Sequence, residues 1–332
     1  MKIALQGSYP KIPAGPGPSV RTQIQRFDRG LSGPRDLERT YREVTARVLN
    51  LAAEVGVDLT TDGQIRWNDA FDPIVRDVDN LYAEGLLRLY DNNFYFRHPV
   101  IRGRLAFQGG SLRYWTTLAA EVSRVPLKVA LPGPFTFLAL AEDQSYHHPE
   151  RLLRDLIEVL QMERDSLTEA GVVEIQWDEP QLAQRREVDA QSVIDVYRSL
   201  LSEASLPQSL ALYWGPRVHS WLEPLASLPW SAVYLDAVAD PEVYAVLAAV
   251  SMPWTVGVGA IDARNVRLED PEGLARQLEP VLHRQSAERV VVHPTSGLEL
   301  LPPDRAEAKV RQLAAVRAAV DGTNPSRQSE GR

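Results

Sequence analysis

Two adjacent carboxylates near the middle of the chain are the residues best placed to do chemistry. Asp178 and Glu179 end the apolar, β-prone run 172–177, and Pro180 follows at once. This order predicts a buried strand that stops at the two acids, because proline cannot donate the next hydrogen bond of a ladder. Side chains alternate along a strand, so one carboxylate can face a binding site while the other supports a loop. A simple strand-to-helix cap is the alternative, since aspartate is common before turns.

The composition is that of an ordinary globular protein. The 332 residues are 44% hydrophobic and 24% charged, and the net charge is −8. A net negative charge disfavours nucleic-acid binding, and no apolar run approaches the roughly 20 residues of a membrane span. The first residues lack the apolar core of a signal peptide, so we expect a cytoplasmic protein with a small-molecule substrate and no membrane partner. The chain has no cysteine, which excludes disulfides, a thiolate nucleophile and cysteine metal ligands.

Strand-like and helical segments alternate along the whole chain. Eight apolar runs have strand character, and each is followed by a helical segment; they cover residues 3–6, 57–61, 127–131, 172–177, 209–214, 232–235, 254–258 and 289–292. This alternation predicts an α/β fold with a parallel sheet, and eight units predict a (β/α)8 TIM barrel. A doubly wound open sheet is the alternative, but residues 7–18 lack the G-x-G-x-x-G spacing that usually follows its first strand.

The barrel predicts both the domain organisation and the position of the site. We expect one domain over residues 1–320, with an aromatic-rich insertion at 68–115 after the second strand, and a disordered polar tail at 321–332. TIM-barrel sites form at the carboxyl ends of the strands. The residues at the predicted strand ends are Ser8, Asp62, Gln64, Gly133, Asp178, Glu179, Tyr213, Gly215, Asp236, Asp262, His293 and Ser296.

Six segments resemble, in the same order, the C-terminal catalytic barrel of the cobalamin-independent methionine synthase family. GSYPK at 7–11 resembles its GSFP opening, and TDGQIRWNDA at 61–70 resembles its G-E-x-x-R stretch. GPFTFL at 133–138 is similar to GPVTIL, and IQWDEPQL at 175–182 is similar to IQIDEPAL. GAIDARN at 259–265 and HPTSGLELL at 293–301 fit the last two strand ends, where the family has G-x-x-D and NPDCGL. The resemblance implies the barrel superfamily that includes uroporphyrinogen decarboxylase.

The resemblance also implies a zinc site whose ligands this chain does not retain. In the family, zinc activates the homocysteine thiol, which is methylated from a methyl-folate. Its ligands are the His and Cys of an H-x-C motif, a Glu, and the Cys of NPDCGL. The matching positions here are Tyr213, Gly215, Asp236 and Ser296. Zinc needs nitrogen, sulfur or oxygen ligands, and glycine offers no side chain. We therefore expect no zinc and assign no metal ligands. The oxygens of Tyr213, Asp236 and Ser296 leave a hard cation such as Mg²⁺ as an alternative, although a single carboxylate makes a weak site.

The substrate end of the family site is retained in part. Asp178 matches the family aspartate that holds the substrate ammonium, and we expect it to be the catalytic anchor. Ser8 matches a serine near the substrate carboxylate, while Gln64 replaces a glutamate and removes its charge. Arg264 replaces a histidine and could hold a carboxylate or phosphate. The other predicted substrate-binding residues are Arg66, for which an ion pair with a neighbouring carboxylate is the structural alternative, Asp69, Trp177, Glu179 and His293.

The predicted function is methyl transfer to or from a small substrate without the thiol-activating zinc, with a methyl-folate as the only cofactor that the resemblance suggests. Trp177 and Trp214 lie on neighbouring predicted strands, which is compatible with an aromatic wall for a flat ligand such as a pterin. Two alternatives remain. One is a metal-free lyase or decarboxylase of the uroporphyrinogen decarboxylase type, with Asp178 as anchor and Arg264 on a substrate carboxylate. The other is a non-catalytic ligand-binding barrel.

Overall fold

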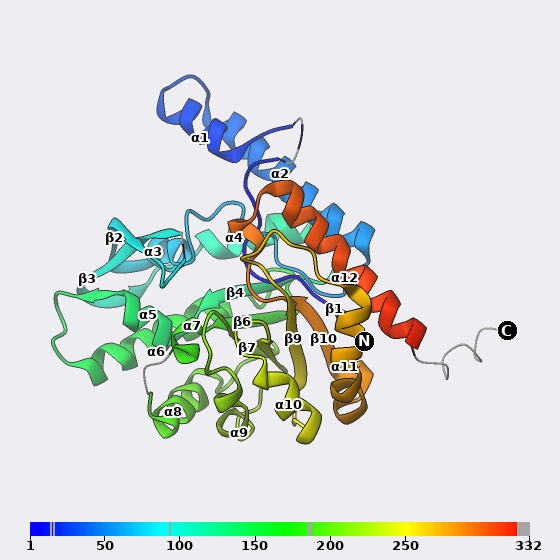
Figure 1. Ribbon diagram of the computed structural model, residues 1–332. Coiled ribbons are helices and arrows are strands. Elements are labelled where there is room, and N and C mark those ends of the chain that lie inside the picture. The colour runs from blue at the N-terminus through cyan, green and yellow to red at the C-terminus, as the bar shows by residue number, and fades with distance from the viewer. Residues whose placement is uncertain (14, 16, 93, 185–187, 324–332) are drawn as a thin grey trace.

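A curled sheet of parallel strands forms the centre of the computed structural model, which describes residues 1–13, 15, 17–92, 94–184 and 188–323 (Figure 1). The strand order is β1-β10-β9-β8-β7-β6-β4, and every pair is parallel. The strands are β1 (Lys2–Ile3), β4 (Lys128–Pro132), β6 (Glu174–Asp178), β7 (Gln208–Leu212), β8 (Ala232–Asp236), β9 (Thr255–Ile261) and β10 (Val290–Pro294). The predicted α/β fold with a parallel sheet is confirmed.

The segment 58–60 lies between the two outermost strands of this sheet. Leu59 forms a parallel bridge with Ala4, just after β1, and Thr60 forms one with Leu127, just before β4. The carbonyl of Thr60 also accepts a hydrogen bond of 2.8 Å from the backbone N–H of Lys128. The second predicted strand, 57–61, is therefore present as a pair of bridges that connect β1 to β4.

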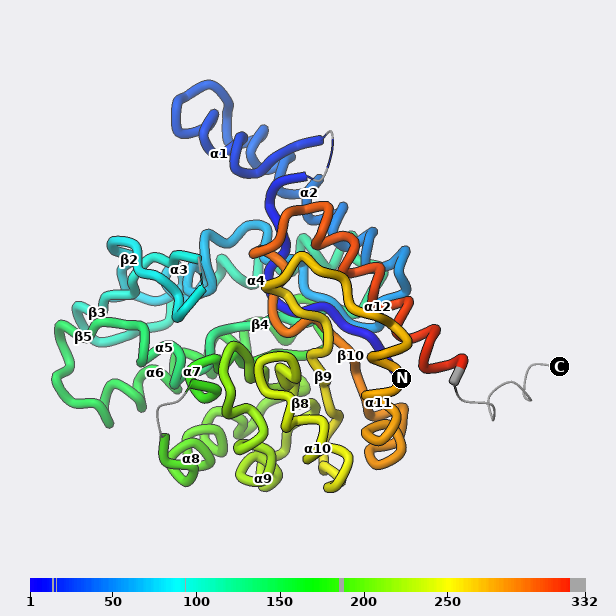
Figure 2. Tube along the Cα trace, in the orientation of Figure 1, coloured from blue at the N-terminus to red at the C-terminus, as the bar shows by residue number. Residues whose placement is uncertain are grey.

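Helices cover the convex side of the curled sheet (Figure 1). Helix α1 and the start of α2 project away from the rest of the molecule (Figure 2). Within the described part of the chain, no helix has both the length and the apolar character to span a bilayer. The helices are α1 (Val20–Asp28), α2 (Pro34–Val55), α3 (Asp72–Asp77), α4 (Ser111–Ala120), α5 (Pro134–Leu140), α6 (Pro149–Ser166), α7 (Pro180–Ala183), α8 (Ala190–Leu200), α9 (Leu222–Leu225), α10 (Glu242–Ala249), α11 (Pro271–Gln285) and α12 (Pro303–Thr323), with 3-10 turns at His219–Trp221, Ala287–Arg289 and Leu298–Leu300.

The chain end departs from the prediction over three residues. Residues 321–323 complete α12 and are not a disordered tail. The remainder of the predicted tail, 324–332, lies outside the described residues.

The insertion contains a β-hairpin that the sequence analysis did not predict. Strands β2 (Val78–Arg88) and β3 (Tyr95–Phe107) pair antiparallel, and β5 (Glu142–Asp143) adds to β3 to make a three-stranded sheet. Most residues of β2 are exposed. A half-buried strand is usually recognised by the alternation of apolar and polar side chains. Strand β2 lacks this alternation, so no pattern in the sequence indicated it.

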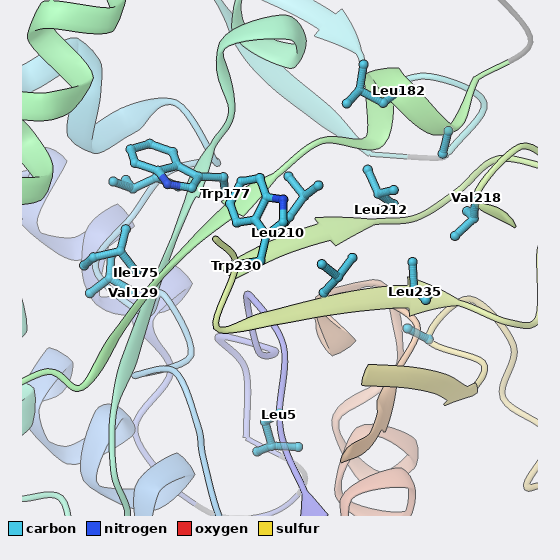
Figure 3. Packing of buried hydrophobic residues seen from close by; sticks show 14 of the residues in the cluster. Leu5, Val129, Ile175, Trp177, Leu182, Leu210, Leu212, Val218, Trp230 and Leu235 are labelled. Atoms are coloured by element: carbon cyan, nitrogen blue, oxygen red, sulfur yellow. The ribbon is translucent and has the colours of Figure 1, made fainter. Parts of the chain in front are cut away.

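The hydrophobic core fills the space between the curled sheet and its helices (Figure 3). Trp177 lies in this layer beside Ile175 and Val129, is 0% exposed, and donates its indole N–H to Gln208 Oε1 at 2.9 Å. Because side chains alternate along β6, Trp177 must face the helices when Asp178 faces the other side. Its predicted role as a substrate-binding residue is wrong.

Candidate functional site

Asp178 lies at the carboxyl edge, which we define as the edge of the curled sheet where the parallel strands end. The side chain is half-buried, and each oxygen accepts one hydrogen bond. Gln176 Nε2 donates to Oδ1 at 2.7 Å, and the hydroxyl of Tyr213 donates to Oδ2 at 3.1 Å. Burial raises the pKa of Asp178 to about 6, although these two bonds and the ammonium of Lys128 oppose the shift. The carboxylate is therefore charged at neutral pH.

Glu179 has the opposite role from its neighbour and supports a loop. It is fully buried. Its Oε1 accepts hydrogen bonds from the Phe135 N–H at 2.9 Å and the Tyr197 hydroxyl at 2.7 Å. Its Oε2 accepts bonds from the N–H and the hydroxyl of Thr136 at 2.7 and 2.5 Å. Gly133 must lack a side chain, because a Cβ there would lie 2.4 Å from Glu179 Oε1. Glu179 therefore fixes α5 against β6, and its predicted substrate contact is wrong.

Trp214 connects two of the positions where the resembled family has metal ligands. Its backbone N–H donates to Asp236 Oδ2 at 3.0 Å, and its indole N–H donates to the hydroxyl of Ser296 at 3.0 Å. The other oxygen of Asp236 accepts the N–H groups of Val238 and Ala239 at 3.1 and 2.8 Å. Asp236 is thus held by three backbone N–H groups, and Ser296 by the indole.

The four residues at the family's ligand positions do not fit a zinc ion. The Tyr213 hydroxyl is bonded to Asp178, and the other two side chains are bonded to Trp214. At Gly215 even a Cβ would lie 1.9 Å from the carbonyl oxygen of Ala183. Across the residues that the structure describes, no group of three or more His, Cys, Asp or Glu side chains is arranged to hold a metal ion.

Ser8 and Gln64 lie at the same edge of the sheet as Asp178. Ser8 packs against Gly297, where a Cβ would lie 2.6 Å from the serine Oγ. Gln64 has a left-handed backbone with φ of 52° and donates its amide to the Ala130 carbonyl at 3.1 Å. Both polar groups are buried.

A continuous series of contacts joins these residues around the carboxyl edge. Asp178 bonds Tyr213, whose ring centroid lies 4.8 Å from that of Trp214. The indole of Trp214 bonds Ser296, which directly precedes the Gly297 that packs on Ser8. Side chains from the end of β6 and from the segments after β7, β10 and β1 therefore converge, although Trp177 does not take part.

Arg66 and Asp69 serve the structure around this edge. The guanidinium of Arg66 forms a bidentate ion pair with Glu38 of α2, and both distances are 2.7 Å. The carboxylate of Asp69 accepts the N–H groups of Phe71 and Arg97, both at 2.9 Å. The structure thus gives both side chains structural partners, and for Arg66 it shows the ion pair that was the structural alternative.

His293 and Arg264 each have partners other than Asp178. His293 is buried and its Nδ1 lies 2.7 Å from the Pro294 carbonyl, while its ring meets that of Tyr234 edge-on. Burial lowers the pKa of His293 to about 3, so it is uncharged. Arg264 is exposed, and its guanidinium lies 3.5 Å from the Asn92 side-chain oxygen at the tip of the β2–β3 hairpin.

Lys128, on β4, was missed by the sequence analysis. Its buried ammonium donates to Gln6 Oε1 at 3.1 Å and lies 3.7 Å from the ring centroid of Tyr234. Burial lowers its pKa to about 8, against the opposing charge of Glu174. A lysine inside the otherwise apolar run 127–131 was a usable signal, because lysine is rarely buried without a partner.

Tyr90, at the tip of the hairpin, was also missed. Its ring centroid lies 6.4 Å from that of Trp214, and its hydroxyl donates to Gln181 Oε1 at 3.3 Å. The hairpin tip therefore covers part of the carboxyl edge. No local pattern in the sequence indicated this long-range contact.

Comparisons with known proteins agree on one family. The model of the cobalamin-independent synthase N-terminal domain matches residues 68–286, whereas the motifs were compared with the C-terminal barrel. The methionine synthase of Sulfolobus acidocaldarius is 28% identical over 298 residues, which cover 89% of this chain and 85% of that protein. That of Sulfurisphaera tokodaii is 26% identical over 306 residues, with the same coverages of 89% and 85%.

Two solved structures share the fold. The B12-independent methionine synthase from Shewanella sp. W3-18-1, in complex with selenomethionine, has a TM-score of 0.77 at 18% identity, covering 97% of this chain and 98% of that one. A methyltransferase from Methanosarcina mazei has a TM-score of 0.61 at 15% identity, covering 95% and 94%.

Proposed function

This chain belongs to the cobalamin-independent methionine synthase family, and we propose that it is a methyltransferase that acts on a small substrate held at Asp178 without a zinc ion. The observation that carries the proposal is the bonding of Trp214, whose two N–H groups reach Asp236 and Ser296. These donors stabilise the oxygens that a metal would otherwise need. The charged anchor of the family site, Asp178, remains half-exposed and available.

The proposed enzyme is a closed (β/α)8 barrel formed by a single domain over residues 1–320. The segment 58–60 acts as the eighth strand, since its bridges connect β1 to β4. The β2–β3 hairpin is the main part of the insertion after this strand. Such closure supports the proposal because it brings the carboxyl ends of all eight strands around one site.

In this mechanism the residues at the carboxyl edge bind and orient the substrate. Asp178 provides the negative charge for a cationic group, and the Tyr213 hydroxyl fixes one of its oxygens. A methyl-folate is a candidate donor, but no step of the proposal depends on it. Without a metal, a substrate thiol with a pKa near 8.5 would be only a few per cent thiolate at neutral pH. Methylation of homocysteine is therefore expected to be undetectable or very slow.

Elemental analysis of the purified protein tests the metal-free proposal. We expect no stoichiometric zinc, with or without added zinc followed by dialysis, because the side chains that would hold it are already bonded or absent. About one tightly held zinc per chain would contradict the proposal. Methyl transfer from methyl-folate to homocysteine should be measured on the same sample, and robust turnover would also contradict it.

The decarboxylase alternative gains no support from the described residues. It requires Arg264 to hold a substrate carboxylate near Asp178, but Arg264 is exposed and reaches Asn92 on the hairpin. A binding-only barrel is distinguished by activity: it would bind substrate at Asp178 and transfer no methyl group.

A further inference from the structure

We propose that the rings of Tyr90, Tyr213 and Trp214, together with the carboxylate of Asp178, bind a methylated onium cation, meaning a quaternary ammonium or sulfonium group of a small substrate. This inference rests on the proposed function, because it names the chemical class of substrate at the same site. We call these four residues the aromatic corner.

The three rings are arranged as walls rather than as a stack. The Tyr213 and Trp214 rings meet at 83° with centroids 4.8 Å apart, and the Tyr90 and Trp214 rings meet at 68° with centroids 6.4 Å apart. All three residues are half-buried. A cation is attracted to the face of an aromatic ring within about 6 Å of its centroid, and methylated ammonium groups are typical ligands of such assemblies. In each edge-to-face pair the edge of one ring covers one face of the other, and a compact cation would contact the remaining faces.

The charges around the aromatic corner favour a cation. Within the corner, Asp178 is joined to the rings by the bond from the Tyr213 hydroxyl, and it is charged at neutral pH. The neighbouring cations are hydrogen-bonded elsewhere: Lys128 bonds Gln6 and faces Tyr234, and Arg264 bonds Asn92. Lys128 acts on Asp178 through its charge only, without a hydrogen bond to it. The carboxylate is therefore the charge that the corner offers to a ligand.

The state of the Asp178 oxygens favours a methylated cation over a primary ammonium. Each oxygen already accepts a hydrogen bond from the protein, one from Gln176 and one from Tyr213. A primary ammonium has three N–H donors that need acceptors when they leave water. A methylated onium group has no such donors, so it fits a site made of ring faces and a partly satisfied carboxylate.

Backbone strain indicates that the corner is preformed. Tyr90 and Trp214 both have left-handed backbones, with φ of 50° and 64°, although neither is glycine. Such strain persists only where the surroundings enforce it, and it concentrates at binding sites. Here the hydroxyl bond of Tyr90 to Gln181 and the two N–H bonds of Trp214 hold the rings. A rigid site loses less entropy when its ligand binds.

Binding of choline by the full chain tests this inference. Calorimetry and tryptophan fluorescence should compare choline with its uncharged isostere 3,3-dimethyl-1-butanol, and trimethylsulfonium should serve as the sulfur analogue. We expect choline to bind at least about tenfold more tightly than the isostere, as a desolvated cation–π contact allows. Trimethylsulfonium should compete with choline. Equal affinities for choline and the isostere would overturn the inference.

Variants separate ring contact from loss of structure. Tyr90→Leu and Trp214→Leu should each weaken choline binding severalfold, whereas Tyr90→Phe keeps the ring and should retain most of the affinity. Tyr95→Leu, at an exposed position of the same hairpin, is the matched control and should bind like the unmodified protein. If Trp214→Leu fails to fold, the comparison of Tyr90→Leu with Tyr90→Phe still shows whether the aromatic ring contributes to choline binding. Unchanged binding in folded Tyr90→Leu and Trp214→Leu would overturn the inference.

Failure of this inference is distinguishable from failure of the proposed function. Methyl transfer that depends on Asp178 in a protein that does not bind choline would overturn the onium site and leave the proposed function standing. Choline binding that depends on the rings, in a protein without any methyl transfer, would support the onium site and count against the proposed function.

Discussion

Asp178 and Glu179 are adjacent in the chain, yet their surroundings give them different chemistry. Asp178 accepts two side-chain hydrogen bonds and remains half-exposed. Glu179 is fully buried among donors from α5 and α8. Because strand side chains alternate, the two carboxylates necessarily face opposite sides. One is therefore available to a ligand, and the other has a structural role.

Replacing Asp178 with asparagine should abolish the anchor while preserving the fold. We expect choline binding, and any methyl transfer found, to fall by at least about tenfold, since the negative charge that attracts the cation is lost. In the unmodified protein both should decline as the pH falls through about 6, because the pKa of Asp178 is raised to that value and protonation removes its charge. Asp195→Asn, on the exposed face of α8, is the control. If choline binding by Asp178→Asn still declines below about pH 6, the decline in the unmodified protein does not come from Asp178.

Replacing Glu179 with alanine should destabilise the protein rather than alter ligand affinity alone. The change leaves the N–H groups of Phe135 and Thr136 and the hydroxyls of Thr136 and Tyr197 without their acceptor. Buried donors without partners cost about 1–3 kcal/mol each, so a loss of several kcal/mol is expected. Urea unfolding measures it, with exposed Glu158→Ala on α6 as the control. A midpoint equal to that of the control would show that α5 does not depend on this carboxylate.

At the scale of elements, the loop after β7 determines what the site can hold. Trp214 directs one N–H to β8 and another to the loop after β10, so a single residue connects three strand ends. Gly215 follows it and passes so close to α7 that no side chain fits. The loop therefore places the rigid ring of Trp214 next to Gly215, a position that has no room for the side chain of a metal ligand.

Restoring the family cysteine at Gly215 should damage the fold instead of creating a zinc site. A Cβ at this position would lie 1.9 Å from the Ala183 carbonyl oxygen, and a backbone atom cannot rotate away. We expect Gly215→Cys to lower the melting temperature strongly or to prevent soluble expression. Ser296→Cys, a nearly isosteric change, should fold normally. A double variant that folds like the unmodified protein and binds one zinc per chain would disprove the steric argument.

Much of the element pattern was predictable, because buried parallel strands and amphipathic helices leave periodic signals in the sequence. The hairpin β2–β3 was not, because most of β2 is exposed and its apolar residues show no alternation. The convergence of Ser8, Asp178 and Tyr213 followed from strand ends alone. The ion pair of Arg66 with Glu38 could not be predicted from strand ends, because Glu38 lies on α2 and only the fold brings the two residues together. The position of Trp177 in the core could have been deduced, because neighbouring residues of a strand face opposite sides of the sheet and Asp178 faces the site.

At the scale of the whole molecule, buried ionisable groups occupy both sides of the sheet. Lys128, Glu174 and His293 lie on its concave side, where they contact Tyr234. On the convex side, Glu163 of α6 is fully buried, and neither carboxylate oxygen has a hydrogen-bond partner among the described residues. Burial raises the pKa of Glu163 to about 8, and the nearby charge of Asp77 adds to the shift. Such groups make the stability of the whole fold depend on pH.

The stability should therefore fall as the pH rises from about 6.5 to 8. In this range the folded protein keeps a proton on Glu163 that the unfolded chain, with an ordinary glutamate pKa near 4.5, has already lost. Because the folded protein binds more protons than the unfolded chain, its free energy of unfolding decreases as the pH rises, here by about 1–2 kcal/mol between pH 6.5 and 8. Burial lowers the pKa of His293 to about 3, so it is neutral in the folded state and contributes little above pH 6.5. Glu163→Gln cannot titrate and should reduce the slope of this part of the profile. The slope that remains comes from Glu179, whose pKa burial raises to about 7. Glu158→Gln, exposed on the same helix, should keep the unmodified slope. Urea midpoints at pH 6.5, 7.2 and 8.0 measure the difference. Parallel profiles for the unmodified protein and Glu163→Gln would show that Glu163 is charged in the folded state.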